Sequence, residues 1–308
     1  SAYIADYSAV GAPMFGVLYE VDTTGGSSSY LPLGQTEDYV ISAGDRDNWV
    51  TIRFNQAINL VPGMYMAAIG GLVPLGSKSA NWVKKNYAAG QSWVDLGTYK
   101  NKSGKKEFYG FFFNVNVKSL VWYSPENFEA GGYSVPNTME ELIALSDQIV
   151  KDGGTPWCIG LGSGDATGWP ATDWVEDLML RTQPPSVYDG WVTNDVKFND
   201  PRVVAAIETF GKFAKNSKYV DGGMAAVGST DFRDSPKGLF TVPPRCYMHR
   251  QASFIPAFFP KRVKVGEDAD FFYFPSYSTK KLGNPVLGGG TLLAMAKDSK
   301  ATREFIKY

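Results

Sequence analysis

Apolar and polar positions in the first part of the chain follow strand patterns. Residues 17–21 (VLYEV) and 49–54 (WVTIRF) alternate in polarity or run through β-branched and aromatic side chains, which favours strands. Residues 23–29 (TTGGSSS) are typical of a loop. No stretch before residue 72 keeps a helical period for three turns. The pattern therefore predicts a small β-rich segment over residues 1–72.

The pattern changes after residues 70–76 (GGLVPLG), where strands and helices begin to alternate. Such alternation is typical of an α/β layered domain, which we expect over residues 73–308. The apolar runs that predict its strands are residues 108–115, 119–123, 157–161, 271–275 and 291–296.

The clearest helix pattern covers residues 136–154. Thr138 and Glu141 have the spacing of a capping box, and the apolar positions that follow recur on one face. Gly153 suits the C-terminal end of such a helix. Residues 173–180 predict another helix with Asp173 as its N-cap.

Residues 200–215 predict a third helix. Asp200 fits the N-cap and Pro201 the first helical position. One apolar face is expected to contain Val203, Ile207, Phe210 and Ala214. Near the end of the sequence, Ser299 is predicted to cap a further helix that Tyr308 cuts off.

Composition and charge exclude several classes of protein. The chain has 308 residues, enough for two domains, and a formal net charge of -1, which argues against a nucleic-acid binder. No run of 18 apolar residues predicts a membrane span, and no signal peptide precedes SAYIADYSAV, so we expect a processed protein or a fragment. The single histidine, His249, excludes multi-histidine metal sites and leaves little room for a catalytic triad.

The two cysteines leave two alternatives open. Cys158 and Cys246 form one disulfide in an oxidising compartment, or both stay reduced and buried. Two thiols are too few for a metal cluster. No metal, cofactor or catalytic residue is predicted.

Residues 165–174 (DATGWPATDW) combine aromatic and acidic side chains. Trp169 and Trp174 stand five apart, with Asp165 and Asp173 close by. An indole covers the apolar face of a pyranose ring, and carboxylates accept hydrogen bonds from its hydroxyl groups. This mixture predicts a carbohydrate site.

The acidic residues of this segment have two other interpretations, one structural and one catalytic. Asp173 as a helix cap and Glu176 in the first helical turn explain the acidic residues without any ligand. A glycosidase using Asp165, Asp173 or Glu176 is the catalytic alternative, since such enzymes need two carboxyl groups across the scissile bond. The glycine-rich segments 161–168 and 287–293 lack the phosphate-loop lysine and predict tight turns.

Longer stretches carry a family resemblance. Residues 118–181 (KSLVWYSPENF…WPATDWVEDLMLR), together with CYMHRQASFIPAFFP and PVLGGGTLLAMAKDS, resemble the sugar-binding proteins of bacterial ABC importers, in particular their alpha-glucoside-binding group. The resemblance covers about residues 75–308, and residues 1–72 do not match it. It implies a two-lobe periplasmic-binding-protein-like α/β fold with an incomplete first lobe, preceded by the β-rich segment and truncated at the C-terminus.

The resemblance also implies a function and a set of ligand contacts. Such proteins have no enzymatic activity, lie in the periplasm or outside the cytoplasm, bind an oligosaccharide between their lobes and deliver it to a membrane permease, touching the membrane complex only peripherally. The family tryptophan near the end of the second lobe is replaced here by HRQASF. With the local pattern included, the candidate ligand residues are Asn116, Trp122, Asp165, Trp169, Asp173, Trp174, Arg250, Gln251, Gly289 and Gly290.

A third hypothesis assigns the function to the N-terminal segment. In that case residues 1–72 form a secreted β-module with a structural or adhesive role, and the remainder of the chain supports it. Removal of the segment would then abolish a partner interaction and leave sugar binding unchanged.

Overall fold

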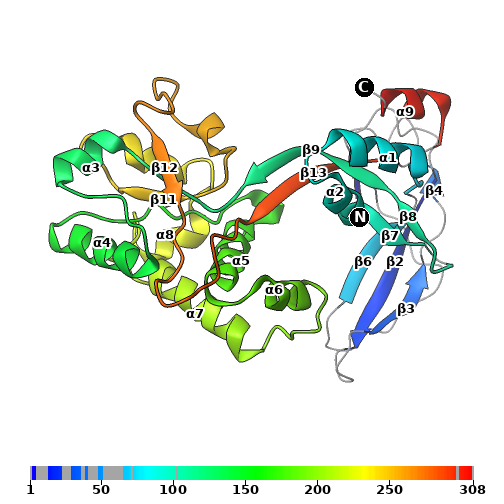
Figure 1. Ribbon diagram of the computed structural model, residues 1–308, viewed down its shortest axis with the longest axis horizontal. Coiled ribbons are helices and arrows are strands. Elements are labelled where there is room, and N and C mark those ends of the chain that lie inside the picture. The colour runs from blue at the N-terminus through cyan, green and yellow to red at the C-terminus, as the bar shows by residue number, and fades with distance from the viewer. Residues whose placement is uncertain are drawn as a thin grey trace. The chain divides into compact units, whose positions relative to one another are not determined.

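The computed structural model describes residues 72–101, 103–295 and 298–306 together with six strands between residues 2 and 70 (Figure 1). Two compact units divide the chain. Unit 1 contains Ser1–Asn114 and Gly290–Tyr308, and unit 2 contains Val115–Gly289. The chain passes from unit 1 to unit 2 in β9 (Gly110–Val117) and returns in β13 (Gly288–Ala294), and these two strands pair. The predicted boundary at residue 72 stays a prediction.

The N-terminal strands of unit 1 agree with a β-rich segment. A four-stranded sheet has β2 at its centre, with antiparallel partners on both sides, and a second pair joins β1 to β5. The predicted strand 17–21 lies within β2, whereas residues 51–54 of the predicted strand 49–54 and residues 23–28 of the predicted loop lie outside the described residues. The strands are β1 (Ala2–Ile4), β2 (Pro13–Asp22), β3 (Ser29–Gln35), β4 (Tyr39–Val40), β5 (Asn48–Val50) and β6 (Tyr65–Gly70).

The remainder of unit 1 packs around a small apolar cluster. Its buried members are Leu75, Val83, Phe108 and Met295. Ser299 caps the last helix by accepting a hydrogen bond from the Thr302 amide, which confirms that prediction. The elements are α1 (Ser77–Asn86), α2 (Gly90–Leu96), β7 (Thr98–Lys100), β8 (Lys106–Phe108) and α9 (Lys300–Phe305).

Unit 2 is built on a three-stranded antiparallel sheet with β10 (Leu120–Tyr123) in the middle. One neighbour is β11 (Met248–Arg250) and the other is β12 (Asp270–Tyr273), and Trp122 stands opposite a residue of each. The predicted strands 119–123 and 271–275 are therefore confirmed as β10 and β12. The predicted strands 108–115 and 291–296 correspond to β9 and β13, and residue 296 lies outside the described residues. Residues 157–161 are different: most of them are buried, but they make only isolated bridges, at Trp157, and no continuous strand.

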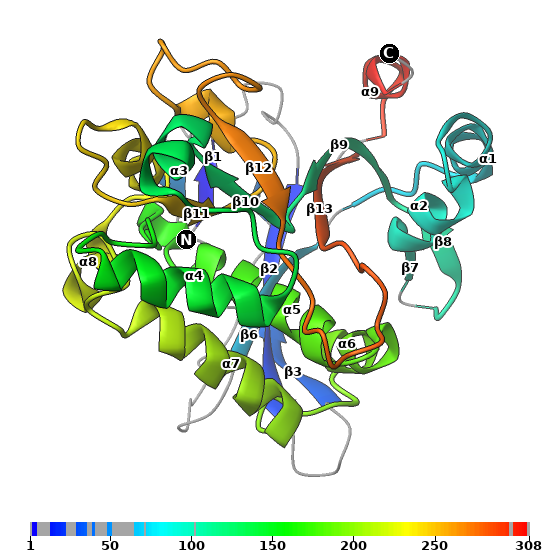
Figure 2. The ribbon, with the colours of Figure 1, turned by 60° about the vertical axis from the view of Figure 1, so that its left-hand side comes forward.

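Helices cover this sheet, and α5 packs against α7 (Figure 2). The capping predictions for two helices are confirmed: Thr138 accepts from the Glu141 amide at the start of α4, and Asp200 accepts from the Arg202 amide at the start of α7. The helices are α3 (Pro125–Gly131), α4 (Met139–Lys151), α5 (Trp169–Thr182), α6 (Pro185–Val192), α7 (Pro201–Ala214) and α8 (Met224–Ser229), with 3₁₀ turns η3 (Gly164–Ala166), η4 (Ser235–Phe240) and η5 (Ile255–Phe258).

The apolar face of α7 differs in part from its prediction. Val203 and Ala214 are buried, but Ile207 is 36% exposed, and Ala206 and Phe213 take the inner positions. Ala206 and Phe213 lie three and ten residues after Val203, and at 100° per residue these positions share one face of the helix. The prediction placed Ile207 on that face, where Ala206 lies instead.

An aromatic core fills the space between the sheet and these helices. Trp157 is fully buried, its indole N–H donates to Ser146 Oγ at 3.0 Å, and its ring contacts Trp174 and Phe213 edge-on. Such edge-to-face contacts add to the stabilisation that burial of large apolar surfaces gives. Most of the tryptophan and phenylalanine in this part of the chain therefore serves packing.

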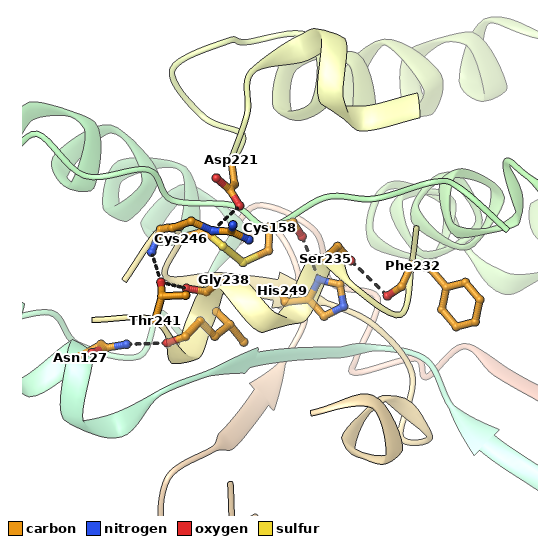
Figure 3. Close-up of a disulfide and its surroundings, with 11 residues drawn as sticks. Asn127, Cys158, Asp221, Phe232, Ser235, Gly238, Thr241, Cys246 and His249 are labelled. Atoms are coloured by element: carbon orange, nitrogen blue, oxygen red, sulfur yellow. Dashed lines mark hydrogen bonds and ion pairs between the residues drawn. A yellow bond between two sulfur atoms is a disulfide. The ribbon is translucent and has the colours of Figure 1, made fainter. Parts of the chain in front are cut away.

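The two cysteines form a disulfide, Cys158–Cys246, with a Cα–Cα distance of 5.5 Å (Figure 3). Of the two alternatives that the sequence left open, the oxidised one is present. The bond lies beside buried His249, whose Nδ1 is 2.8 Å from the Cys158 carbonyl oxygen. By closing a long loop, a disulfide of this sequence separation restricts the unfolded chain.

Candidate functional site

Helix α5 begins at Trp169, earlier than predicted, so the candidate residues Trp169 and Asp173 both lie within it. Gly168 is its N-cap with φ of 107°, a conformation that favours glycine, and Trp169 and Pro170 form the first turn. Asp173 lies one turn inside the helix, so its prediction as N-cap is wrong. Trp169, Asp173 and Glu176 recur at intervals of four and three residues, which puts them along one side of α5.

An aromatic face lies at the start of this helix. It consists of Trp169, Phe232 and Phe254, all of them half-buried, and we call these three residues the aromatic face. The Trp169 ring centroid is 5.0 Å from that of Phe232 and 5.9 Å from that of Phe254. The two phenylalanines hold the indole from the side. Part of each ring stays open to solvent and can stack against an apolar ligand surface.

Polar groups border the aromatic face. Asp165 is exposed in η3, four residues before Trp169. Ser253, next to Phe254, has its hydroxyl 3.2 Å from the Val117 amide and 3.5 Å from Asn116 Oδ1. The structure thus brings Asn116, Asp165 and Trp169 of the predicted set to one region of unit 2.

A charged pair lies one helical turn from Trp169. Lys118 Nζ donates to Asp173 Oδ1 at 2.6 Å, and the Asp173 side chain is only 3% exposed. The other carboxylate oxygen, Oδ2, is buried and has no hydrogen-bond partner in the part of the chain that the structure describes. A buried oxygen of this kind is costly unless a donor reaches it. It is therefore an unsatisfied acceptor just beneath the surface of unit 2.

Glu176 continues the same side of α5. Its Oε2 accepts a hydrogen bond of 2.9 Å from the Tyr188 hydroxyl of α6. Burial raises the pKa of Glu176, and the Asp173 carboxylate adds to the rise, while the Tyr188 hydrogen bond opposes it. Burial and the neighbouring Glu176 also raise the pKa of Tyr188. Glu176 and Tyr188 thus place a carboxylate and a hydroxyl group side by side in a partly buried position.

A buried ion cluster lies beneath the polar groups. Asp177 accepts from Arg250 Nη2 at 2.6 Å and from Ser119 Oγ at 2.8 Å. Arg181 Nη2 is 3.0 Å from Asp177 Oδ1, without the alignment of a hydrogen bond, and its Nε donates to the Phe274 carbonyl. All three charged side chains are 0–1% exposed. Arg250 is therefore buried and paired inside unit 2, and its ligand contact stays a prediction.

Three further candidates are also sealed inside unit 2. Trp174 is 2% exposed, packed against Trp157, Phe210, Phe213 and Phe274, and Arg250 covers its ring at 5.6 Å. Trp122 is 3% exposed, and its indole N–H donates to the Gln251 carbonyl. Gln251 is 2% exposed, with its side-chain oxygen accepting from the Ala252 amide. These three side chains are therefore engaged in packing and internal hydrogen bonds, and their ligand contacts stay predictions.

The two glycines have packing reasons. A Cβ on Gly289 would lie 2.5 Å from Lys118 Cε, so glycine leaves room for the lysine that pairs with Asp173. A Cβ on Gly290 would lie 2.6 Å from the Asn114 carbonyl oxygen in the neighbouring strand. Gly289 therefore supports the site indirectly, and Gly290 permits a close strand approach.

Sequence reasoning missed Lys118, Phe232, Phe254 and Ser253. Lys118 and Asp173 are 55 residues apart, and Trp169 meets Phe232 across a parallel bridge that joins Gly162 to Asp231. Nothing in the local pattern links such distant positions. The one available signal was the position of Lys118 next to a buried strand. A charged side chain at the end of an interior strand usually has a partner of opposite charge, although the sequence does not show which residue that is.

Two features are absent from the described residues. No group of three or more His, Cys, Asp or Glu side chains there is placed to hold a metal ion. Among the same residues, no helix is both long and apolar enough to cross a membrane.

The chain is similar to several known proteins. A family model described as bacterial extracellular solute-binding protein matches residues 40–308. The alpha-glucosides-binding periplasmic protein AglE of Rhizobium meliloti (strain 1021) is 63% identical over 250 residues, 80% of this chain and 55% of the relative. The osmoprotective compounds-binding protein GgtB of Synechocystis sp. is 44% identical over 249 residues, 80% of this chain and 57% of the relative.

Solved structures agree on the fold. One described as a chitin oligosaccharide binding protein has a TM-score of 0.58 at 21% identity, with 77% of this chain and 56% of that chain covered. The predicted periplasmic-binding-protein-like α/β fold is thereby confirmed. The family model begins at residue 40, within the segment that the resemblance had left out.

The match covers most of this chain but only part of its relatives. The chain spans 55% and 57% of the two relatives' lengths, so the activity and partners of a whole protein remain proposals. The family description agrees with the predicted extracytoplasmic location. Because the model matches residues 40–308, this protein belongs to the family of bacterial extracellular solute-binding proteins.

Proposed function

We propose that this chain binds an α-glucoside or a similar oligosaccharide at the aromatic face of unit 2. The identity of 63% to a protein named for binding alpha-glucosides supports this ligand class. The observation that carries the proposal is the half-open indole of Trp169 one turn away from the buried, unpartnered Oδ2 of Asp173, among the residues that the structure describes. One group suits the apolar face of a pyranose, and the other suits its hydroxyl rim.

The chemistry of the site fits a neutral sugar better than an ion. Lys118 already neutralises Asp173, so this pair itself presents no net charge to a ligand. A hydroxyl that donates to Asp173 Oδ2 would make a charge-assisted hydrogen bond, which is stronger than a bond between neutral groups. Asn116 and Asp165 supply further polar groups at the rim. Ligand pockets commonly combine a few such groups with apolar walls.

The proposal includes a partner and a location. The bound sugar passes to the permease of an ABC importer, and the protein meets that membrane complex only at its periphery. Family membership and the similarity to a periplasmic binding protein support this role. The Cys158–Cys246 disulfide is consistent with an oxidising compartment outside the cytoplasm.

Isothermal titration tests the ligand. We expect saturable heat with at least one of maltose, sucrose and trehalose, and a loss of at least tenfold in affinity for Trp169→Ala. The matched control is Phe271→Ala, which removes a 46% exposed ring outside the aromatic face and should keep the affinity of the unaltered chain. A protein without heat toward any of these disaccharides, or equal losses in both variants, would contradict the proposal.

A glycoside-cleaving enzyme is the competing function. The observation in its favour is Glu176, a carboxyl group whose pKa is raised by burial and which lies on the same side of α5 as Asp173. Against an enzyme, the Tyr188 hydroxyl occupies one oxygen of Glu176, and Lys118 pairs with one oxygen of Asp173. We expect no release of reducing sugar from sucrose or trehalose, and turnover abolished by Glu176→Gln would establish the enzyme instead.

A further inference from the structure

A second group of aromatic side chains continues from the proposed site. Tyr188, Trp191 and Phe198 follow one another, with ring centroids 6.2 Å apart at each step. Tyr188 is anchored to Glu176 of α5, Trp191 is half-buried, and Phe198 is 67% exposed. The row therefore runs from the polar groups of α5 outward to solvent.

The geometry of α5 relates the two aromatic groups. Trp169 and Glu176 are on one side of the helix, seven residues and so about 10 Å apart along its axis. Asp173, the partner of Lys118, lies between them in the helix, and it contributes to the pKa shifts of both Glu176 and Tyr188. Figures 1 and 2 both show α6 alongside α5. Aromatic, polar and aromatic groups thus succeed one another along one surface of unit 2.

Tyr188 and Trp191 pack in part against the core, but the outermost ring of the row, Phe198, is left largely exposed. Val192 and Phe198 are both 67% exposed, in a unit whose other tryptophan-rich region is sealed. Exposed apolar clusters bordered by polar residues are typical of binding surfaces. Here the border includes Glu176, a carboxylate acceptor that reaches the row through Tyr188.

We propose that Tyr188, Trp191 and Phe198 form a second sugar-stacking subsite, which holds an additional pyranose unit of a longer α-glucoside. This inference rests on the proposed function, since the first unit of the sugar must occupy the aromatic face. Trp191 and Phe198 supply the stacking surfaces, and Glu176 accepts a hydrogen bond from a hydroxyl group of the sugar. The ligand class is then an oligosaccharide of three or more units rather than a disaccharide.

Titration of the full chain with maltose and maltotriose tests the subsite. We expect Trp191→Ala to weaken maltotriose binding about tenfold and to leave maltose binding within twofold. Phe198→Ala, whose exposed ring contributes little to folding, should weaken maltotriose binding about threefold and keep the melting temperature. Phe271→Ala is the control for loss of an exposed ring elsewhere in unit 2.

The outcomes separate this inference from the function on which it rests. If the unaltered chain binds both sugars and neither Trp191→Ala nor Phe198→Ala changes their affinity ratio, the subsite is wrong and the proposed function stands. If both variants weaken maltose as much as maltotriose, these rings belong to the first site and the extension is wrong. If the unaltered chain binds no α-glucoside, both proposals fall.

Discussion

Trp169 and Trp174 lie five residues apart in one helix and have opposite environments. Trp169 stays half-open between Phe232 and Phe254, whereas Trp174 is 2% exposed within the aromatic core. At 100° per residue, five positions turn the side chain by about 140°, almost to the other side of the helix. The same residue type in the same short segment therefore suits ligand contact at one position and folding at the other.

The polar residues of α5 divide in the same way. Asp173 has a buried oxygen without a partner among the described residues, whereas Asp177, one turn later, is fully engaged by Arg181, Arg250 and Ser119. The engaged carboxylate lies among the residues that hold the unit together. The partly engaged one lies next to the open indole. Two carboxylates one turn apart in the same helix thus differ in how fully their oxygens are satisfied.

Among the substitutions that test this comparison, Trp174→Ala is expected to lower the free energy of unfolding the most. It removes a ring that contacts four aromatic side chains in a sealed core, and such substitutions cost about 3–5 kcal/mol of unfolding free energy. Chemical denaturation of the two chains measures the difference. A loss of less than about 1 kcal/mol, the size typical of an average substitution, would show that Trp174 adds little to the core and would undo the contrast with Trp169.

The buried His249 is expected to make stability depend on pH, with a slightly smaller effect on the free energy of unfolding. Burial lowers the pKa of His249 from its ordinary 6.5 to about 4. Between these values the unfolded chain binds a proton that the folded chain does not, so stability falls as the pH decreases from 6.5 to 4, by about 3 kcal/mol in total. Above pH 6.5 and below pH 4 this contribution is constant.

His249→Asn provides the control, because an amide can still donate to the Cys158 carbonyl but does not titrate. Denaturation curves between about pH 7 and pH 4 should be flatter for the variant than for the unaltered chain. The difference between the two slopes isolates His249 from the carboxylates that titrate in the same range. Identical slopes would show that the ring is not held neutral.

The sequence predicted the elements of the fold better than their phase. The caps at Thr138, Asp200 and Ser299 are local hydrogen bonds between residues two to three apart, so their spacing is visible in the chain. The start of α5 was misplaced because Asp173 resembles a cap, while Gly168 and Pro170 already begin the helix. Trp174 was proposed from its place in the aromatic and acidic segment, where the sequence does not show which indole packs inward.

The candidate site was only partly predictable for a related reason. Asn116, Asp165, Trp169 and Asp173 belong to segments with visible patterns, and the structure brings them to one region. Lys118, Phe232 and Phe254 join them through contacts between residues 55 to 85 positions apart. Arg250 and Gln251 have the polarity of ligand contacts, but the interior pairs them first. Only three-dimensional packing decides which polar groups remain available.

Lys118→Met should have an intermediate effect, because it leaves Asp173 buried without its partner. Removal of one member of a well-shielded pair costs more than the pair itself contributes, and we expect about 2 kcal/mol here, where the lysine side chain is 22% exposed. The double variant Lys118→Met with Asp173→Asn should recover most of that loss. Urea denaturation of the four chains of this cycle measures the coupling, and additive losses would show that the pair is not formed.

The smallest effect on stability is expected at Trp169, the residue to which the proposed function assigns the stacking contact with the sugar. Trp169→Ala removes a half-open ring with two aromatic neighbours, and we expect a loss of about 1 kcal/mol in unfolding free energy together with the affinity loss of at least tenfold. The same denaturation series as for Trp174→Ala gives the comparison directly. Because the two positions share one helix, differences in helix propensity cancel between the variants. If both alanine variants lost about 3 kcal/mol or more, the ring of Trp169 would also be a core residue, and the open face on which a pyranose stacks would have to lie elsewhere in the chain.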